Sequence, residues 1–423
     1  MMNVLQFLMT EVLSQPAVLI GLFALVGLLA QKKSAADVVS GSIKATIGFL
    51  ILGAGAGTLV GALNHFSVIF TEAFSITGVI PNNEAIVSLA QEVVGAETAM
   101  IMVFGMLMNI LLARFTPFKY IFLTGHHTMF MAAMLSAILV GGGVKGVPLV
   151  IIGSVVLGIV MVIFPAMAQP FMKEITGSDD VALGHFGTTG YVAAALTGKL
   201  VGNKEHSTEN MKFPKGLMFL RDTTIATGLT MLILFLITVL FAGSEFVESQ
   251  VSGGQNFIMF AIMQSLVFAA GVYIVLAGVR MIISEIVPAF KGIADKIVPN
   301  AKPALDCPVV FPFAPVAVIV GFIASFAAGI VGMFLLSLVG ATVIIPGVIP
   351  HFFTGATAGV FGNSTGGRRG AVIGAFVNGL IITILPILLL PVLGALGYAN
   401  TTFGDSDFGI IGIIIGNIVK LFM

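Results

Sequence analysis

Apolar stretches long enough to cross a lipid bilayer recur along this chain and limit what it can fold into. A spanning helix needs about 20 mostly apolar residues. Hydrophobic residues make up 58% of the 423 residues and charged residues only 9%, whereas an average soluble domain has about 25% charged residues. A water-soluble protein of this composition would lack the polar surface needed to cover its core. The sequence therefore predicts a polytopic membrane protein of the all-α class.

Ten stretches fit a spanning helix, and we expect ten to eleven spans. They lie near residues 14–30, 44–63, 97–113, 120–140, 147–170, 220–242, 257–280, 313–340, 371–396 and 408–423. Two further segments, Val181–Leu200 and Pro350–Gly367, are too polar for ordinary spans and too apolar and glycine-rich for loops. Irregular backbone at membrane depth is tolerated where it packs in protein or lines a wet cavity. Both segments are predicted to be re-entrant hairpins or broken helices.

The placement of charges predicts an orientation in the membrane. The 19 basic and 19 acidic side chains cancel, so no net charge points to nucleic acid as a partner. Short cytoplasmic loops accumulate Lys and Arg. Along this chain, basic clusters alternate with connections that contain Asp or Glu and no Lys or Arg. The basic clusters include Lys32/Lys33, Lys199–Arg221 and Arg368/Arg369, and the acidic connections are Glu72–Glu97, Glu245–Glu248 and Asp405–Asp407. This alternation predicts an external N-terminus and a cytoplasmic C-terminus.

The basic connection around residues 199–221 divides the chain almost in half. Each part, residues 1–212 and 213–423, contains several spans and one broken segment, which suggests two pseudo-symmetric halves of one membrane domain. A short similarity supports this division, because His185-Phe186-Gly187-Thr188 resembles His351-Phe352-Phe353-Thr354.

Ionisable and polar groups at membrane depth are costly, so they are functional candidates. His126 directly follows Gly125, and its neighbour His127 points about 100° away on a helix, so at most one of them is expected to face a given cavity. We favour His126 for recognition of substrate hydroxyls. The alternative is that the two histidines cap a helix end or bond to backbone carbonyls.

Three more polar side chains stand in glycine- or proline-rich surroundings. His185 lies among glycines that permit close approach of a ligand, and Thr354 has similar neighbours in the second half. Asp306 precedes Cys307-Pro308 at the beginning of an apolar segment, where a carboxylate could accept two hydrogen bonds from a polyol or bind a cation. Two of them also have a structural alternative. The His185 side chain could form its hydrogen bonds within a tight turn, and Asp306 could cap a helix.

The sequence favours transport over enzymatic chemistry. There is no Walker-type phosphate loop, no nucleophile elbow and no run of His, Cys or carboxylates with metal-site spacing. The single cysteine excludes a disulfide within the chain. We therefore predict no metal, no cofactor and no catalytic phosphotransfer residue, and Arg368 and Arg369 would also suit docking of an acidic or phosphorylated partner.

Several short motifs follow one another in order along the chain. They are Lys32-Lys33-Ser34 through Phe49, Leu123-Thr124-Gly125-His126, Gly184-His185, Gly278-Val279-Arg280-Met281, Leu305-Asp306-Cys307, Phe313-Ala314-Pro315, and Phe352-Phe353-Thr354 with Gly359-Val360-Phe361. These motifs resemble those of the ascorbate-type IIC permeases, the membrane components of the bacterial phosphoenolpyruvate-dependent phosphotransferase system. The resemblance spans nearly the whole chain.

The resemblance implies a multi-pass protein of the bacterial inner membrane that imports ascorbate or a related sugar acid or polyol. It implies a homodimer in which a mobile core carries the substrate like an elevator, and a separate IIB protein, charged by IIA, that phosphorylates the substrate. By matching positions, His126, His185, Asp306 and Thr354 would contact the substrate, and Asn83 with Glu84 would take the place of polar contacts from the rest of the subunit.

Two positions depart from the ascorbate pattern. Amide side chains are expected four residues after the first histidine and one after the second, where this chain has Phe130 and Phe186. Loss of two hydrogen-bonding partners weakens recognition of a small polyhydroxylated lactone, so a related sugar acid or polyol rivals ascorbate. The alternative mechanism is a proton- or sodium-coupled transporter that uses Asp306 and the histidines as ion sites. A third interpretation is a membrane-embedded enzyme, for which the sequence offers no nucleophile–base pair.

Overall fold

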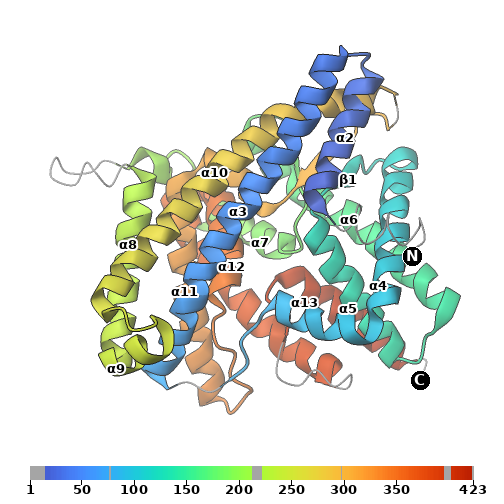
Figure 1. Cartoon of the computed structure of the whole chain (residues 1–423). Coiled ribbons are helices and arrows are strands. Elements are labelled where there is room, and N and C mark those ends of the chain that lie inside the picture. Colours follow the sequence, from blue (N-terminus) through green and yellow to red (C-terminus); the bar gives the residue numbers. More distant parts are fainter. Residues whose placement is uncertain (1–14, 76–77, 212–221, 297, 395–401, 422–423) are drawn as a thin grey trace.

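The computed structural model describes residues 15–75, 78–211, 222–296, 298–394 and 402–421, and helices account for most of them (Figure 1). The helices are α2 (Pro16–Ala30), α3 (Ala35–Phe74), α4 (Asn83–Phe115), α5 (Gly125–Gly141), α6 (Gly146–Thr176), α7 (Thr188–Val201), α8 (Thr223–Ala242), α9 (Ser244–Phe246), α10 (Phe257–Lys296), α11 (Pro315–Leu338), α12 (Val348–Gly394) and α13 (Ser406–Lys420). Short 3₁₀ or π segments are η2 (Thr208–Asn210), η4 (Val247–Val251) and η5 (Cys307–Phe313), and the strands are β1 (Tyr120–Phe122), β2 (Ala182–Leu183) and β3 (Lys302–Leu305).

Within the described ranges, six helices are long and apolar enough to cross a membrane. The number becomes seven if α8 and the α9–η4 segment, bent by 103° at their junction, count as one span. Two shorter apolar helices, residues 17–30 and α5, add to the apolar content. The helical, multi-pass membrane architecture is as the sequence indicates, and the count of ten to eleven spans stays a prediction.

Two long helices, α3 and α10, run side by side across the molecule, and α2 and α8 pack against them (Figure 1). We call α2, α3, α8 and α10 the α3–α10 unit. The contact is close because small residues lie at the crossing: a Cβ added at Gly55 would lie 2.6 Å from the Val275 backbone nitrogen, and one at Gly278 would lie 2.5 Å from that of Leu52. Small residues at such positions let helix backbones approach in a membrane.

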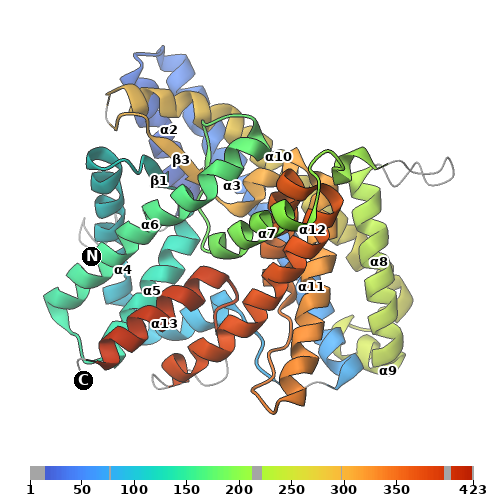
Figure 2. The ribbon, with the colours of Figure 1, turned by 180° about the vertical axis from the view of Figure 1, so that it is seen from behind.

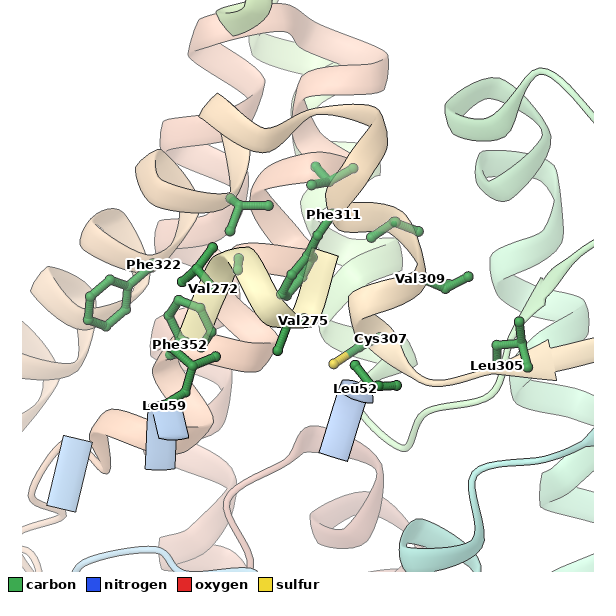
Figure 3. Close-up of a cluster of buried hydrophobic side chains, with 14 of the residues drawn as sticks. Leu52, Leu59, Val272, Val275, Leu305, Cys307, Val309, Phe311, Phe322 and Phe352 are labelled. Carbon is green, nitrogen blue, oxygen red and sulfur yellow. The ribbon is translucent and has the colours of Figure 1, made fainter. Parts of the chain in front are cut away.

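Helices α4 to α7 and α11 to α13 form a second group. We call these helices, together with β1 to β3 and the residues that directly follow each strand, the hairpin unit. Here α4 packs on α5 and α6, and α12 packs on both α7 and α11 (Figure 2). Buried apolar side chains join the two units, with Leu52 and Leu59 of α3 in the same cluster as Phe311 and Phe352 (Figure 3). The hydrophobic core is therefore continuous across the boundary between the units.

A three-stranded parallel sheet stands inside this helical fold. Its order is β1-β3-β2, with Phe122 opposite Ala304 and Leu183 opposite Leu305. The helix predicted over 120–140 begins only at Gly125, because the apolar run before it is a strand, and a short apolar run gives no periodicity that separates strand from helix. The sheet brings together three segments that are distant in sequence.

Both segments predicted to be broken have irregular backbone. Residues 181–200 contain β2, a turn and most of α7. In the second segment, α12 reverses direction at Gly367, where φ is 58° and ψ is −146°. A straight helix would separate residues 362 and 370 by about 12 Å, yet a Cβ added at Gly362 would lie 2.2 Å from the Gly370 carbonyl oxygen. Residues 348–366 and 368–394 are thus two arms of a helical hairpin, and its partial insertion into the membrane stays a prediction.

The boundary predicted between the two halves, at residues 212 and 213, lies outside the described residues. Pseudo-symmetry of residues 1–212 and 213–423 stays a prediction.

Candidate functional site

The three candidate residues His126, His185 and Asp306 each follow one strand of the parallel sheet. Asp306 comes directly after β3, His185 lies two residues after β2, and His126 lies four residues after β1. Strands that run parallel end at the same edge of a sheet. The sheet thereby brings together three side chains that the sequence separates by up to 180 positions.

Asp306 lies between the two histidines. Its carboxylate oxygens are 3.5 Å from Nε2 of His126 and 3.8 Å from Nε2 of His185. One of them also accepts a 2.7 Å hydrogen bond from the Cys307 backbone N–H, which fixes the carboxylate at the start of η5. The exposed fractions of the side chains are 38% for His126, 17% for Asp306 and 3% for His185, so the cluster reaches from the open part of the site into the protein interior.

The ring of His185 is held from behind by Tyr191 of α7. The Tyr191 hydroxyl lies 2.8 Å from Nδ1 of His185, and both side chains are buried. A proton on Nε2 faces the Asp306 carboxylate, and in that tautomer Nδ1 accepts the hydroxyl proton of Tyr191. This arrangement orients a hydrogen-bond donor toward the carboxylate.

His127 belongs to the same cluster, although the sequence favoured His126 alone. Both side chains line one cavity, so the expectation that at most one of them faces it was wrong. The cavity surrounds the first turn of α5, where neighbouring side chains that point about 100° apart both reach it. Nδ1 of His127 lies 3.4 Å from the Phe186 backbone N–H, and its ring centroid is 3.9 Å from that of His185.

The cavity has a volume of about 510 Å³ and lies between the two units. The hairpin unit contributes His126, His127 and His185, and the start of α12 adds Ile349 and Phe353. The facing side of α3 contributes residues at helical spacing: the small or polar Gly53, Ala56, Gly57, Asn64 and Ser67, and the larger apolar Phe49, Leu52, Val60 and Leu63. A Cβ added at Gly53 or Gly57 would have no neighbouring heavy atom within 4 Å. The space beside this part of α3 is open.

The other predicted site residues have different positions. Asn83, in the first turn of α4, lines the cavity, and its side chain donates to Asp405 at 2.7 Å and accepts the Gly404 N–H at 2.8 Å. The backbone of Glu84 is helical, and its side chain lies outside the described part of the structure. Thr354 is fully buried and is not among the cavity-lining residues; its hydroxyl donates to the Pro350 carbonyl at 2.8 Å. The part of Thr354 in substrate binding stays a prediction.

Asp405 and Asp407, interpreted from the sequence as charges of an external connection, are buried beside the site. Asp405 lines the cavity. Asp407 accepts the backbone N–H groups of Thr188 and Thr189 at 2.8 and 3.0 Å, and it thereby caps the N-terminus of α7. Asp407 lies in the first turn of α13 and caps a different helix, 218 positions away from Thr189, so nothing local in the sequence indicates this role or the position of Asp405 at the cavity.

The two phenylalanines at the expected amide positions form part of an aromatic cluster. Phe130 lines the cavity and Phe186 is fully buried. Both rings pack against Phe408 of α13, with centroid distances of 6.4 Å for Phe130 and 5.6 Å for Phe186. Phe130 therefore offers apolar surface to the cavity where an amide was expected, whereas Phe186 is not among the cavity-lining residues.

The fold also assembles possible metal-ligand sets that the sequence spacing does not show. Three combinations place one ligand atom of each residue within 4.8 Å of the others: His126, His127 and Asp306; His127, His185 and Asp405; and His185, Asp306 and Cys307. The 3.4 Å contact of His127 Nδ1 with the Phe186 N–H leaves the proton on Nε2, which makes that nitrogen a donor in the neutral ring. The same imidazoles and carboxylates also suit sugar hydroxyls.

A separate ionic cluster anchors β3 to the end of α6. Asp179 lies 2.6 Å from Nζ of Lys302 and 2.9 Å from Nζ of Lys173, and Gln169 donates to it at 2.8 Å. Burial of Asp179 acts to raise its pKa, but the hydrogen bonds from Lys302, Lys173 and Gln169 and the charge of Lys302 outweigh burial and lower the pKa to about 2. The cluster holds Lys302, the first residue of the strand that ends directly before Asp306.

Comparisons with known proteins identify the family of this chain. Residues 11–407 match the family described as PTS system sugar-specific permease component (EIIC-GAT). The chain is also 27% identical, over 438 aligned positions, to the ascorbate-specific PTS system EIIC component of Mycoplasma pneumoniae (strain ATCC 29342 / M129 / Subtype 1). That similarity covers 87% of this chain and 64% of the relative. The chain belongs to the family of sugar-specific permease components of the phosphotransferase system.

Proposed function

We propose that this chain imports ascorbate, a related sugar acid or a polyol as the IIC component of a phosphotransferase system. The observation that carries the proposal is the convergence of His126, His185 and Asp306 on a cavity of about 510 Å³. That volume lies within the range of small-molecule sites. The similarity to an ascorbate-specific component supports ascorbate as a candidate.

The chemistry of the cavity suits a polyhydroxylated ligand. The carboxylate of Asp306 can accept two hydrogen bonds, and each imidazole offers a donor and an acceptor. Phe130, Phe353 and the apolar residues of α3 present surface to the carbon skeleton. Binding by a few convergent polar groups on apolar walls gives both orientation and specificity.

Transport in this proposal is coupled to phosphorylation by a partner. The hairpin unit carries the bound substrate past the α3–α10 unit like an elevator, in a homodimer of the bacterial inner membrane. A cytoplasmic IIB protein, charged by IIA, then transfers the phosphoryl group to a substrate hydroxyl. The His and Asp side chains of this chain bind and orient the substrate and do not become phosphorylated.

The proposal is tested by uptake into vesicles that contain the purified full-length chain. The vesicles enclose phosphoenolpyruvate and the general phosphotransferase proteins, with or without the cognate IIB, and receive radiolabelled ascorbate, sugar acids or polyols. We expect phosphorylated product inside the vesicles only when IIB is present. Unmodified solute that accumulates with an ion gradient alone would overturn the proposal.

Replacing His185 with Ala tests the site itself. We expect His185→Ala to abolish substrate binding, because it removes the donor beside Asp306 and leaves the Tyr191 hydroxyl without its partner. His206→Ala is the matched control, since His206 is exposed and lies outside the cavity. Binding is measured by equilibrium dialysis, and the oligomeric state by light scattering. Normal binding by His185→Ala would defeat the assignment of the site.

A proton- or sodium-coupled transporter is the second candidate function. The observation in its favour is the buried grouping of His127, His185 and Asp405, whose ligand atoms lie within 4.8 Å of one another. Ionisable clusters at membrane depth commonly form coupling sites. The vesicle experiment separates the two mechanisms, because ion coupling requires a gradient and no IIB.

A further inference from the structure

The turn at residues 184–188 carries His185, and the backbone on both sides of His185 is held. On the first side, the Gly184 N–H donates to the Leu305 carbonyl at 2.6 Å, which ties the turn to the end of β3. Within the turn, the Thr188 hydroxyl donates to the His185 carbonyl at 2.7 Å. The direction of the His185 side chain therefore also depends on what holds the residues that follow it.

Asp407, in the first turn of α13, holds this second side of the turn. Its carboxyl oxygens accept the N–H groups of Thr188 and Thr189 at 2.8 and 3.0 Å. Its own N–H donates to the Phe186 carbonyl at 2.9 Å. A helix cap needs only bonds to the N–H groups of the helix, whereas Phe186 lies before α7 and directly follows His185. Asp407 thus fixes the turn that carries His185 as well as the start of α7.

The side chain of Asp407 contacts neither the cavity nor solvent. It is fully buried and is not among the cavity-lining residues. Its neighbour Ser406 accepts the Gly190 N–H at 3.2 Å and donates to Oδ1 of Asp407 at 3.1 Å. Because Asp407 does not reach a ligand in the cavity, its effect on binding is transmitted by the turn.

The segment that contains Asp407 also holds Asn83 on another part of the cavity wall. The Asn82 N–H donates to the Thr402 carbonyl at 2.9 Å. The Gly404 N–H donates to Oδ1 of Asn83 at 2.8 Å, and the Asn83 side chain donates to Asp405 at 2.7 Å. Residues 402–407 therefore connect two cavity-lining side chains, Asn83 and His185, that lie on different elements. A binding site keeps its geometry when the surrounding residues fix its side chains in this way.

We propose that Asp407 is a positioning residue for substrate binding, which holds the turn at residues 184–188 so that the His185 ring stays directed at Asp306. This inference rests on the proposed function and adds to its site a residue that does not touch the substrate. The structural alternative is a cap that stabilises α7 and has no effect on the His185 ring.

The first test compares substrate affinity in two cap variants. Asp407→Asn keeps the shape of the side chain and replaces one acceptor oxygen with a donor NH₂ group. Asp222→Asn is the matched control, because Asp222 accepts the Thr224 and Ile225 N–H groups at the start of α8 and is exposed and outside the cavity. Ascorbate and a hexitol are the probes, and binding to the purified full-length permease is measured by equilibrium dialysis.

We expect Asp407→Asn to weaken binding of the tighter probe at least about fivefold, the size expected for the loss of one buried hydrogen bond. Asp222→Asn should leave the affinity unchanged. Circular dichroism verifies that each variant is folded.

The second test observes the His185 ring directly and requires no ligand. The chain has six histidines, so nitrogen NMR of permease with isotope-labelled histidine rings gives few signals, and His185→Gln identifies the signal of His185. We expect Asp407→Asn to shift this signal and to leave the signal of the exposed His206 in place. Ser406→Ala removes the bonds to Gly190 and Asp407 and should shift it less. This milder variant carries both tests if Asp407→Asn does not fold.

The outcomes separate this inference from the proposed function. A His185 signal that stays in place, or an affinity equal to that of Asp222→Asn, would overturn the role given to Asp407 while the permease assignment stands. If the unmodified permease binds neither probe and forms no IIB-dependent product in vesicles, the proposed function fails and the role of Asp407 in substrate binding fails with it.

Discussion

Tyr191 is a residue whose hydroxyl orients another side chain of the site. It lies 2.8 Å from Nδ1 of His185 and is fully buried. His185 in turn faces Asp306 at 3.8 Å, so a chain of polar contacts runs from α7 to the end of β3. A buried ring nitrogen that loses its partner is costly, and the ring of His185 would lose its fixed orientation.

We expect Tyr191→Phe to weaken substrate binding several-fold, up to about tenfold, which corresponds to the net value of one buried hydrogen bond. The protein should still fold, because the ring that packs against Phe361 is retained. Equilibrium dialysis with the best substrate measures the effect. Tyr273→Phe, on the exposed face of α10, is the control, and equal affinities of the two variants would contradict the role given to Tyr191.

Asp179 stabilises the fold in a pH-dependent way. Its pKa in the folded protein, about 2, is below its ordinary value of 3.8, so the unfolded chain binds the proton more strongly. The stabilisation from Asp179 is therefore fully present above about pH 4 to 5 and is lost as the pH falls toward 2. Because the side chain is 45% exposed, solvent reduces the effect.

We expect Asp179→Asn to lower the thermal unfolding midpoint by about 1–3 °C at pH 7. The difference from the unmodified protein should shrink as the pH is lowered toward 2, when the native carboxyl group becomes protonated as well. Thermal unfolding in detergent at a series of pH values measures this. Asp180→Asn is the neighbouring control, since Asp180 is exposed and its side chain bonds to Ser178. A difference that persists unchanged at pH 2 would contradict the charge-based account.

Single residues were partly predictable from the sequence. His126, His185 and Asp306 stand out because they are ionisable groups in apolar surroundings, and the structure brings all three to one cavity. Asp405 was assigned to an external loop because its sequence neighbourhood resembles a solvated connection. Its burial depends on α4 and on Asn83, which is 322 positions away in the chain, and no local pattern reports such a contact.

Among the elements, the short parallel sheet has the largest effect on the site. Each of its strands is two to four residues long, too short for alternating polarity to identify it. The pairing of β3 with both β1 and β2 is set by segments far apart in sequence. Helix prediction from hydropathy placed the flanking elements well, and it could not reveal the strands that position the site.

The helical hairpin of α12 depends on glycine at position 367. Its φ of 58° and ψ of −146° lie in a region that other residues avoid. A Cβ there would also lie 2.4 Å from the Asn203 carbonyl oxygen and 2.5 Å from that of His206. The backbone of the connection after α7 therefore occupies the space that a side chain would need.

We expect Gly367→Ala to destabilise the protein by about 2 kcal/mol or more, through backbone strain of about 1–3 kcal/mol together with the steric clash. The measurement is thermal or denaturant unfolding of the purified protein. Gly61→Ala is the matched control, because Gly61 lies in α3 with open space around it and alanine favours a helix. Equal stability of Gly367→Ala and Gly61→Ala would show that the hairpin does not require this backbone conformation.

At the scale of the whole molecule, the cavity lies between the α3–α10 unit and the hairpin unit. The histidines and Asp306 come from the hairpin unit, whereas α3 contributes small, polar and larger apolar residues, among them Asn64, Ser67 and Leu52. In the proposed elevator movement, the hairpin unit and its substrate move past this face of α3. Buried side chains such as Leu59 and Phe352 also join the units, so movement requires these apolar contacts to exchange.

We expect the purified permease to be a homodimer, with a protein mass twice the 44.0 kDa of one chain. Exposed apolar side chains cover much of α8 and α10, among them Phe241 and Leu266, and part of such a surface can be covered by a second subunit while the rest contacts lipid. Light scattering with correction for bound detergent measures the mass. His185→Ala should give the same mass, and a protein mass of one chain in mild detergent would contradict the dimer.

The sequence by itself determined that this protein lies in a lipid bilayer and which types of functional group it contains. Long apolar stretches with few charges leave a lipid bilayer as the only suitable environment, and polar residues within them are retained at a cost. Tertiary structure alone decided that His127 and Asp405 join His126, His185 and Asp306 around one cavity. The reason is physical: hydropathy is a local property of the chain, whereas the charge balance of a cavity depends on strand pairing and helix packing between distant segments.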